Sequence, residues 1–389
     1  MTALDQTVEM LGTLVRFPTV SANSNLDMIS FLAEVLESAK ARVRVYHDET
    51  GNKANLFATI GPEEQGGIVL AGHSDVVPVA DQAWTADPFQ MKEEHGRLFG
   101  RGTCDMKGFI AAAVTMAPEF SKFAKRRPIH FAFTYDEEVG CFGAKALIEC
   151  LKQEGISPRV AIVGEPTSMR VIDGHKGCYE YSAHFRGQGG HGSLPDRGVN
   201  AVEYAAQYVH ELVNIKKQLE KRAPKDSLYD PPWTTINTGR FNGGVARNVV
   251  PDKASVEWEM RPVCDEDADF VKSRLQQFCD HDLLPKMRTV FPQASIDLEI
   301  VSEIEDFEPA GQNEAKEILA ELTGSDESDL VSFGTEAGIY QSMGMNVAVC
   351  GPGSVDQAHK PDEYVTMEQM DSCLKMLGGL TRKLQDRPD

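Results

Sequence analysis

The sequence lacks the features that mark several classes of protein. None of its eight cysteines forms a CxxC pair, which argues against a zinc ribbon, a dithiol redox motif and a disulfide framework. No apolar run approaches the roughly 18 residues that a membrane-spanning helix needs. No repeat or low-complexity segment is present, and the N-terminal residues MTALDQTVEM carry no basic region or cleavage pattern of an export signal. We therefore expect a cytoplasmic protein with reduced cysteines and no membrane partner.

Basic residues are scarce relative to acidic ones. The chain has 39 lysines and arginines against 59 aspartates and glutamates, a formal net charge of -20. Nucleic acids and anionic membranes would be repelled by such a surface, so neither is an expected partner. The charge is compatible with steering a cationic small molecule, and equally with solubility alone.

The chain of 389 residues is longer than one ordinary domain, and it begins with an alternation of helices and strands. Apolar periodicity predicts helices within 2–40 and at 109–120 and 144–153. Strands are expected at 42–46, 55–60, 68–72, 129–135 and 160–164. This alternation predicts an α/β fold with a mostly parallel central sheet.

A different order of helices and strands is expected in the middle of the chain. A strand at 179–186, a helix at 200–220, strands near 234–241 and 254–260, a helix at 267–278 and a strand at 295–301 follow the order β-α-β-β-α-β. This is the order of the ferredoxin-like motif. The alternation of the first part then resumes with a helix at 314–322, a strand at 346–350 and a helix at 367–384. We predict one domain from 1–175 and 306–389, with residues 176–305 inserted as a second.

The stretch IVLAGHSDVVPV, residues 68–79, places an imidazole and a carboxylate two positions apart where an apolar strand ends. Side chains at i and i+2 of a strand point to the same face, so His73 and Asp75 are expected on one face. A histidine with a nearby carboxylate is the basic unit of a catalytic metal site. A loop histidine beside a solvated aspartate is the alternative.

Other potential ligands follow the ends of the remaining strands. In sheets of this class ligands bind beyond the carboxyl ends of the strands, so side chains that follow those ends share one rim. Another acid stands in RGTCDMKG, just before the helix at 109–120. The residues concerned are His73, Asp105, one of the two neighbours Glu137 and Glu138, Glu165 and His359.

Each of these side chains also has an ordinary explanation, such as a helix N-cap for Asp105, a solvated loop acid for Glu138 or Glu165, or a surface histidine for His359. Two histidines and three acids gathered on one rim would nevertheless be uncompensated groups, which would repel one another or stay hydrated. Divalent cations resolve this crowding, and the mixture of imidazole and carboxylate suits zinc, cobalt or manganese. Five ligands exceed the needs of one open tetrahedral site, which indicates two ions sharing one carboxylate.

The doublet Glu137-Glu138 divides two roles. Neighbours in sequence face different directions, so one acid can bind metal while the other stays available as a general base. Together with a metal-held water and a Lewis acid that polarises the scissile carbonyl, such a base provides the parts of a hydrolytic site. A charged turn after a strand is the alternative.

Several motifs together resemble a known family. AGHSDVVPV, GRGTCDMKG, DEEVG, GEPT, GQGGHGSLPDRGVNA and FNGGVARNVVPDKA resemble the M20 metallopeptidases and deacylases, and SFGTEAG with CGPGSVDQAHKPDEYV is similar to the acetylornithine deacetylase branch. The resemblance implies a zinc-peptidase-like catalytic domain with two ions. Asp105 would bridge them, with His73 and Glu165 on one ion and Glu138 and His359 on the other. Glu137 would be the general base, and Asp75 would orient His73.

For the inserted domain the resemblance implies a lid that also carries a homodimer interface. His191, in GGHGS, matches the histidine that stabilises the oxyanion in the partner subunit's site. Asn248 and Arg261 match substrate-contacting positions, although a salt bridge within the lid competes for Arg261. Glu336 is predicted to face the distal ammonium of the substrate.

The sequence therefore predicts a cytoplasmic, zinc-dependent or cobalt-dependent amidohydrolase acting on an Nα-acyl amino acid. Nα-acetyl-L-ornithine, an intermediate of arginine biosynthesis, is the preferred substrate. A desuccinylase for diaminopimelate, another deacylase or a dipeptidase is the nearest alternative. A metal-binding dimer without turnover is a more remote one.

Overall fold

The computed structural model describes residues 1–63 and 65–386, and its contacts divide the chain into two compact units. The first unit comprises Met1–Gly174, Phe307–Asp329 and Thr335–Asp389, and the second comprises His175–Asp306 and Leu330–Gly334. The last segment differs from the predicted division, which placed it in the first domain. Its backbone explains the difference, because the carbonyl of Val331 accepts from Lys176 N and the Ser332 hydroxyl donates to the carbonyl of Asp230.

The first unit is built on an eight-stranded sheet whose central strands are parallel. In β3, Ile68–His73, all six residues are buried, and β3 pairs in parallel with β6, Ile129–Thr134, and with β7, Val160–Val163. β16, Asn346–Val349, extends the parallel set. The full order is β1 (Arg42–His47), β2 (Ala54–Ile60), β6, β3, β7, β16, β8 (Ile172–His175) and β15 (Asp329–Val331). The predicted α/β class with a mostly parallel sheet is confirmed.

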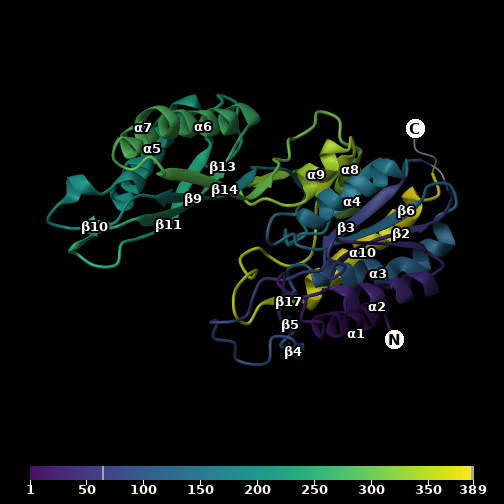
Figure 1. Cartoon of the computed structure of the whole chain (residues 1–389). Helices are drawn as coiled ribbons and strands as arrows, with labels where there is room; N and C mark the ends of the chain where they lie inside the picture. The colour runs from purple at the N-terminus through teal and green to yellow at the C-terminus, as the bar shows by residue number, and fades with distance from the viewer. Residues whose placement is uncertain (64, 387–389) are drawn as a thin grey trace. The chain divides into compact units, whose positions relative to one another are not determined.

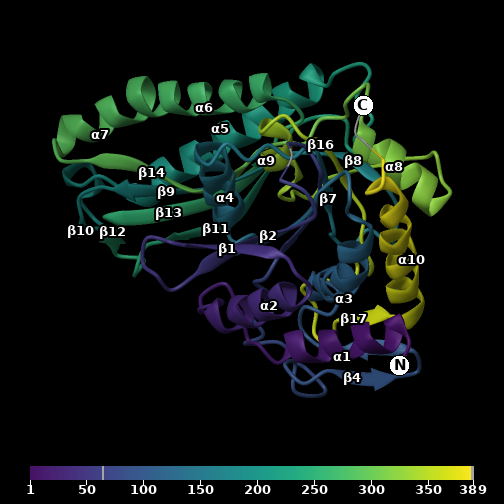
Figure 2. The same ribbon diagram turned by 90° about the vertical axis from the view of Figure 1, so that its right-hand side faces the viewer.

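Helices cover both faces of this sheet, as Figures 1 and 2 show. One face carries α1 (Ala3–Val15), α2 (Leu26–Ser38), α3 (Lys107–Phe123), α8 (Glu314–Thr323) and α10 (Met367–Lys383). The other carries α4 (Phe142–Gln153) and α9 (Ala337–Ser342). Strands covered on both sides read as continuous apolar runs, which explains the lack of alternation in β3 and β6. A small sheet of β17 (Tyr364–Thr366), β5 (Arg97–Phe99) and β4 (Lys92–Glu94) completes the unit.

The second unit contains a four-stranded antiparallel sheet in the order β11-β13-β9-β14, which is the ferredoxin-like order. Its strands are β9 (Cys178–Arg186), β11 (Thr235–Gly243), β13 (Lys253–Arg261) and β14 (Ser295–Ile304). Burial alternates along β9 and β13, and the helices α5 (Ala201–Arg222), α6 (Asp265–Phe278) and α7 (Leu284–Val290) lie on one face (Figure 2). A two-stranded ladder joins β10 (Gly190–His191) and β12 (Val249–Val250), and short helical turns span Pro195–Arg197 and Cys279–Leu283.

Within residues 1–63 and 65–386, no helix combines the length and apolarity needed to cross a membrane. No disulfide joins the eight cysteines in this described part of the chain.

Candidate metal centre and active site

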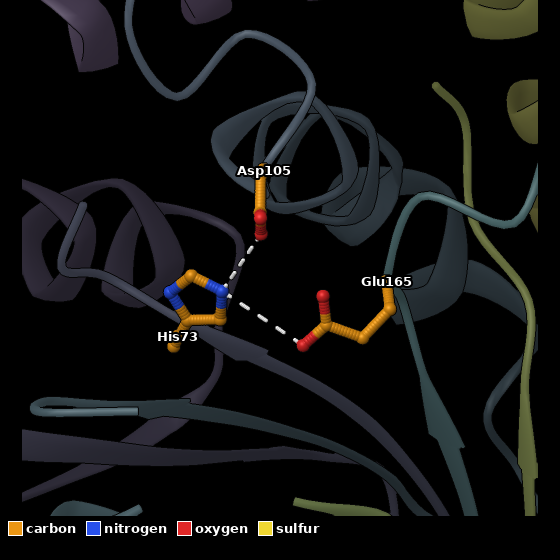
Figure 3. Close-up of side chains that lie close together, drawn as sticks. All are labelled: His73, Asp105 and Glu165. Atoms are coloured by element: carbon orange, nitrogen blue, oxygen red, sulfur yellow. Dashed lines mark hydrogen bonds and ion pairs between the residues drawn. The ribbon is translucent and has the colours of Figure 1, made fainter. Parts of the chain in front are cut away.

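His73 is the last residue of β3, and its imidazole is 1% exposed. Its Nδ1 lies 3.0 Å from the backbone carbonyl of Asp75, and this contact directs Nε2 away from its own strand. Nε2 lies 3.0 Å from Oδ1 of Asp105 and 3.8 Å from Oε1 of Glu165 (Figure 3). The end of the strand thus presents one ring nitrogen to two carboxylates.

Asp105 lies in the buried loop that precedes α3, and its two carboxylate oxygens face different imidazoles. Oδ1 lies 3.0 Å from Nε2 of His73, while Oδ2 lies 3.3 Å from Nε2 of His359. A carboxylate whose oxygens face two separate donor groups has the arrangement required of a ligand shared by two ions.

Glu165 is brought to the rim by a close approach between β7 and α3. A Cβ at Gly164 would lie 1.9 Å from the Phe109 ring, so only glycine permits the strand to pass so near the helix. Glu165 is 6% exposed, and its buried Oε1 has no hydrogen-bond partner in the described part of the chain. Nε2 of His73 lies 3.8 Å from this oxygen, beyond hydrogen-bond distance, so Oε1 keeps the capacity to bind a cation.

A second cluster forms around the other oxygen of Asp105. Nε2 of His359 lies 3.0 Å from Oε2 of Glu138, whose side chain is 6% exposed. His359 adopts φ 62°, a left-handed backbone that is strained for a non-glycine residue and turns its imidazole toward the acids. The predicted ligands therefore come from four strand ends and one loop, as the topology requires.

The electrostatics of this rim reflect crowded acids. Burial, together with neighbouring carboxylates, raises the pKa of Glu137, Glu138 and Glu165 above the usual range. Burial opposes the charge of His73, yet the hydrogen bond to Asp105 and nearby acids raise its pKa. Hydrogen bonds to Asp105 and Glu138 raise the pKa of His359 to about 10. The raised pKa values of the acids reflect negative charge crowded into a buried space, and divalent cations bound there would neutralise that charge.

The residues present fit two metal ions. In each of two groups of the first unit the ligand atoms lie within 4.8 Å of one another, and Asp105 belongs to both. One group is His73, Asp105 and Glu165, and the other is Asp105, Glu138 and His359. Oε1 of Glu165, which has no hydrogen bond within the described residues, supports the same conclusion, and imidazoles with carboxylates suit borderline divalent ions.

Glu137 belongs to neither group of ligand atoms. Its backbone N–H donates to Oδ1 of Asp75 at 3.1 Å, and the N–H of Glu138 donates to Oδ2 of Asp75 at 3.4 Å. Oδ2 also accepts from the Ser21 hydroxyl at 2.7 Å. The Asp75 carboxylate thus fixes the turn that carries both glutamates, whereas its distance to Nδ1 of His73 is 3.7 Å. It is the carbonyl of Asp75 that makes the closer contact with His73.

The remaining predicted residues of the second unit lie on exposed or half-buried segments. Nδ1 of the exposed His191 is 2.7 Å from the Ser193 hydroxyl, and Gly192 N donates to the carbonyl of Asn248. His191 and Asn248 therefore lie on adjacent backbone segments. Arg261 forms the competing salt bridge, with Nη2 2.9 Å from Oε2 of Glu259.

Glu336 lies in the first unit, immediately before α9, and is 1% exposed. The Thr134 hydroxyl donates to its Oε1 at 2.5 Å, and its buried Oε2 has no hydrogen-bond partner within the described residues. Burial raises its pKa to about 7. Its predicted contact with substrate stays a prediction.

Sequence reasoning did not identify the residues that hold the ligand-bearing loops. Nζ of Lys53 lies 2.5 Å from Oδ1 of Asp136, the residue before Glu137, and donates to the carbonyl of Ser21. Glu363 was also missed, although it stands four positions after His359 in a motif already singled out. Single charged residues in loops carry no periodic signal that reveals such partners.

The sequence matches the model of peptidase family M20/M25/M40 over residues 69–383. The chain belongs to this family. Acetylornithine deacetylase of Shigella sonnei is 32% identical over 365 residues, covering 92% of both chains. The predicted resemblance is therefore confirmed, and the chain is a metal-dependent hydrolase of family M20.

Solved structures agree with this fold. A tripeptidase of Staphylococcus aureus gives a TM-score of 0.74 at 20% identity, with 98% of each chain covered. A dinuclear metal binding peptidase of family M20 from Bacillus subtilis gives 0.65 at 15% identity, with 97% of each chain covered. At these identities the similarity establishes the M20 fold alone.

Proposed function

We propose that this hydrolase removes the acyl group from the α-nitrogen of an amino acid, and that Nα-acetyl-L-ornithine is the substrate, yielding L-ornithine and acetate. The observation that carries the chemistry is Asp105, whose two oxygens face the two donor groups while Glu137 stays outside both. The identity to acetylornithine deacetylase supports the substrate. With this substrate, the enzyme would act in arginine biosynthesis in the cytoplasm.

We assign His73 and Glu165 to one ion, Glu138 and His359 to the other, and Asp105 to both. Zinc is the proposed metal and cobalt the alternative, since the donors are imidazole nitrogens and carboxylate oxygens. The Bacillus subtilis relative described as a dinuclear metal binding peptidase supports two ions. Bound there, such ions would supply Lewis acidity to the scissile carbonyl and would lower the pKa of the attacking water.

Glu137 acts as the general base and then as the general acid. Its carboxylate takes a proton from water as the water attacks the amide carbonyl, and returns the proton to the departing amine. Burial raises the pKa of Glu137 above its usual range, which makes its carboxylate a stronger base toward water. The turn held by Asp75 keeps the carboxylate at the rim.

The second unit supplies substrate contacts in this proposal and serves as a lid and homodimer interface. His191 stabilises the oxyanion in the partner subunit's site, which requires an exposed imidazole that a neighbour orients. The exposure of His191 and its contact with Ser193 support this role. Arg261 and Asn248 bind the α-carboxylate side of the substrate, and Glu336 serves the distal ammonium.

A panel of N-acyl amino acids with metal content measured on the same sample tests the proposal. We expect hydrolysis of Nα-acetylornithine to exceed that of N-succinyl-diaminopimelate and of dipeptides. Preferential turnover of the succinyl compound would favour the desuccinylase alternative. Preferential turnover of peptides would favour a peptidase, as the Staphylococcus aureus relative is described. Metal-replete protein inactive on the whole panel would contradict the enzymatic proposal.

A further inference from the structure

Glu363 occupies the segment between His359 and β17, and its carboxylate is 1% exposed. Oε2 accepts from Nη1 of Arg101 at 2.6 Å and from the backbone N–H of Gly102 at 3.1 Å. Oε1 accepts from the N–H of Cys104 at 2.8 Å and from that of Asp105 at 3.0 Å. One carboxylate thus accepts four hydrogen bonds from the loop that carries Asp105.

Three of these bonds satisfy backbone N–H groups that are buried within the loop. Residues 101–106 are all buried, so their N–H groups lose water on folding. Gly102 adopts φ 83°, which opens the loop so that successive N–H groups converge on one point. A carboxylate at this point fixes the backbone of Asp105 as well as neutralising Arg101.

The same network reaches the segment that carries His359. Nη2 of Arg101 donates to Oε1 of Gln82 at 2.7 Å, and Nε2 of Gln82 donates to the carbonyl of His359 at 3.0 Å. Nη1 of Arg101 also lies 3.4 Å from the carbonyl of Lys360. A continuous chain of hydrogen bonds therefore joins the backbone of Asp105 to that of His359.

We propose that Glu363, with Arg101, is a positioning residue that sets the separation of Asp105 and His359 and so prepares the metal centre. The inference rests on the proposed function, in which both residues are ligands. A buried ion pair contributes little net stability compared with apolar side chains of the same volume. All four bonds of Glu363 end on the loop of Asp105, and those of Arg101 reach the segment of His359, which indicates a role in geometry.

The test is Glu363→Gln, measured by zinc affinity of the metal-free protein and by the visible spectrum of the cobalt-substituted protein. The amide must turn its NH₂ toward two of the four donors, whichever way it is oriented. We expect zinc affinity to fall roughly 10- to 100-fold, as for other residues that support metal ligands, and the cobalt spectrum to change. Wild-type affinity together with an unchanged spectrum would overturn the proposal.

The matched control is Asp173→Asn, which also removes a buried carboxylate from the first unit. Asp173 pairs with Lys316 Nζ at 2.6 Å and with the Ser328 hydroxyl at 2.9 Å, neither of them on a ligand-bearing loop. It should lower thermal stability while leaving zinc affinity unchanged. Equal losses of zinc affinity in both variants would reduce the role of Glu363 to general stability and overturn the proposal.

Two further variants complete the design. If Glu363→Gln does not fold, Gln82→Ala provides the test, because it removes the half-buried link to His359. This variant should weaken zinc binding by a smaller factor. Unchanged zinc affinity and an unchanged cobalt spectrum in Gln82→Ala would overturn the proposal. Asp105→Asn distinguishes the ligand role of Asp105 from the positioning role of Glu363. Zinc affinity retained in Asp105→Asn would refute the ligand assignment, and the positioning role with it, whereas loss there without loss in Glu363→Gln refutes the positioning role alone.

Discussion

The carboxylate of Asp75 accepts the backbone N–H of Glu137 at 3.1 Å, which links the end of β3 to the turn that follows β6. The two strands are parallel neighbours, so their carboxyl ends meet at the same edge. The link joins the residue two positions after His73 to the proposed general base. The Asp75 carboxylate thus supports the proposed base, while the Asp75 carbonyl contacts the imidazole of His73.

Asp75→Asn should therefore affect the rate more than the binding of metal. The asparagine amide would face at least one of the N–H or hydroxyl donors now bound by the carboxylate, which displaces Glu137. We expect kcat to fall roughly 10- to 100-fold and zinc affinity to fall by a smaller factor. His73→Ala, as the comparison, should lose zinc as well as rate. Wild-type turnover in Asp75→Asn would contradict this role.

Chelation should abolish activity, and zinc or cobalt should restore it. Metal also neutralises the buried acids Glu138 and Glu165, so the metal-free protein should unfold at a lower temperature than the loaded one. A ligand at about 100 times its Kd stabilises the folded state by about 2.7 kcal/mol per site. Thermal unfolding with and without zinc measures the difference. Equal unfolding temperatures, or full activity after complete metal removal, would count against the centre.

His130 should make stability fall as the medium becomes acidic. Its Nε2–H donates to the carbonyl of Gly66 and its Nδ1 accepts from the Thr59 hydroxyl, so the folded site suits the neutral ring. Burial lowers its pKa to about 4. Below the unfolded value of about 6.5 the unfolded chain binds a proton that the folded chain does not, so stability is lost as pH falls from 6.5 toward 4.

From pH 7 to pH 5 this residue alone should cost about 2 kcal/mol, since each pKa unit is worth about 1.4 kcal/mol. Urea unfolding of the wild type and of His130→Gln at the two pH values isolates the contribution. The variant should be less stable at pH 7 and lose less on acidification. Identical losses in the two proteins would show that His130 does not titrate between the two states as described.

Much of the fold could be predicted because its strands and helices are long and strongly patterned. The apolar run of β3 and the apolar periodicity of α3 are visible in the local sequence. Because ligands bind beyond the carboxyl ends of parallel strands, His73, Glu138 and Glu165 can then be placed together. The three-residue strands β4 and β17 were missed, since β4 is exposed throughout and too short for any alternation. The segment Leu330–Gly334 was assigned to the other domain because hydrogen bonds, not composition, tie it to the second unit.

Within the site, the alternation of side chains along a strand indicates which residues share a face, but it does not indicate which atom accepts a hydrogen bond. For this reason the contact of His73 with the carbonyl of Asp75, in place of its carboxylate, could not be foreseen. Glu363 and Arg101 are 262 positions apart in the chain. Only the folded loops bring them together.

The most direct measurement of the central claim is turnover together with metal content of Glu137→Gln, compared with Glu138→Gln. Glu137 lies outside both groups of ligand atoms, while Glu138 belongs to one. We expect Glu137→Gln to keep two metal ions and to lose roughly 10²- to 10⁴-fold in kcat, whereas Glu138→Gln should lose metal. A Glu137→Gln protein that binds metal and hydrolyses substrate at the wild-type rate would contradict the assignment of Glu137 as the general base.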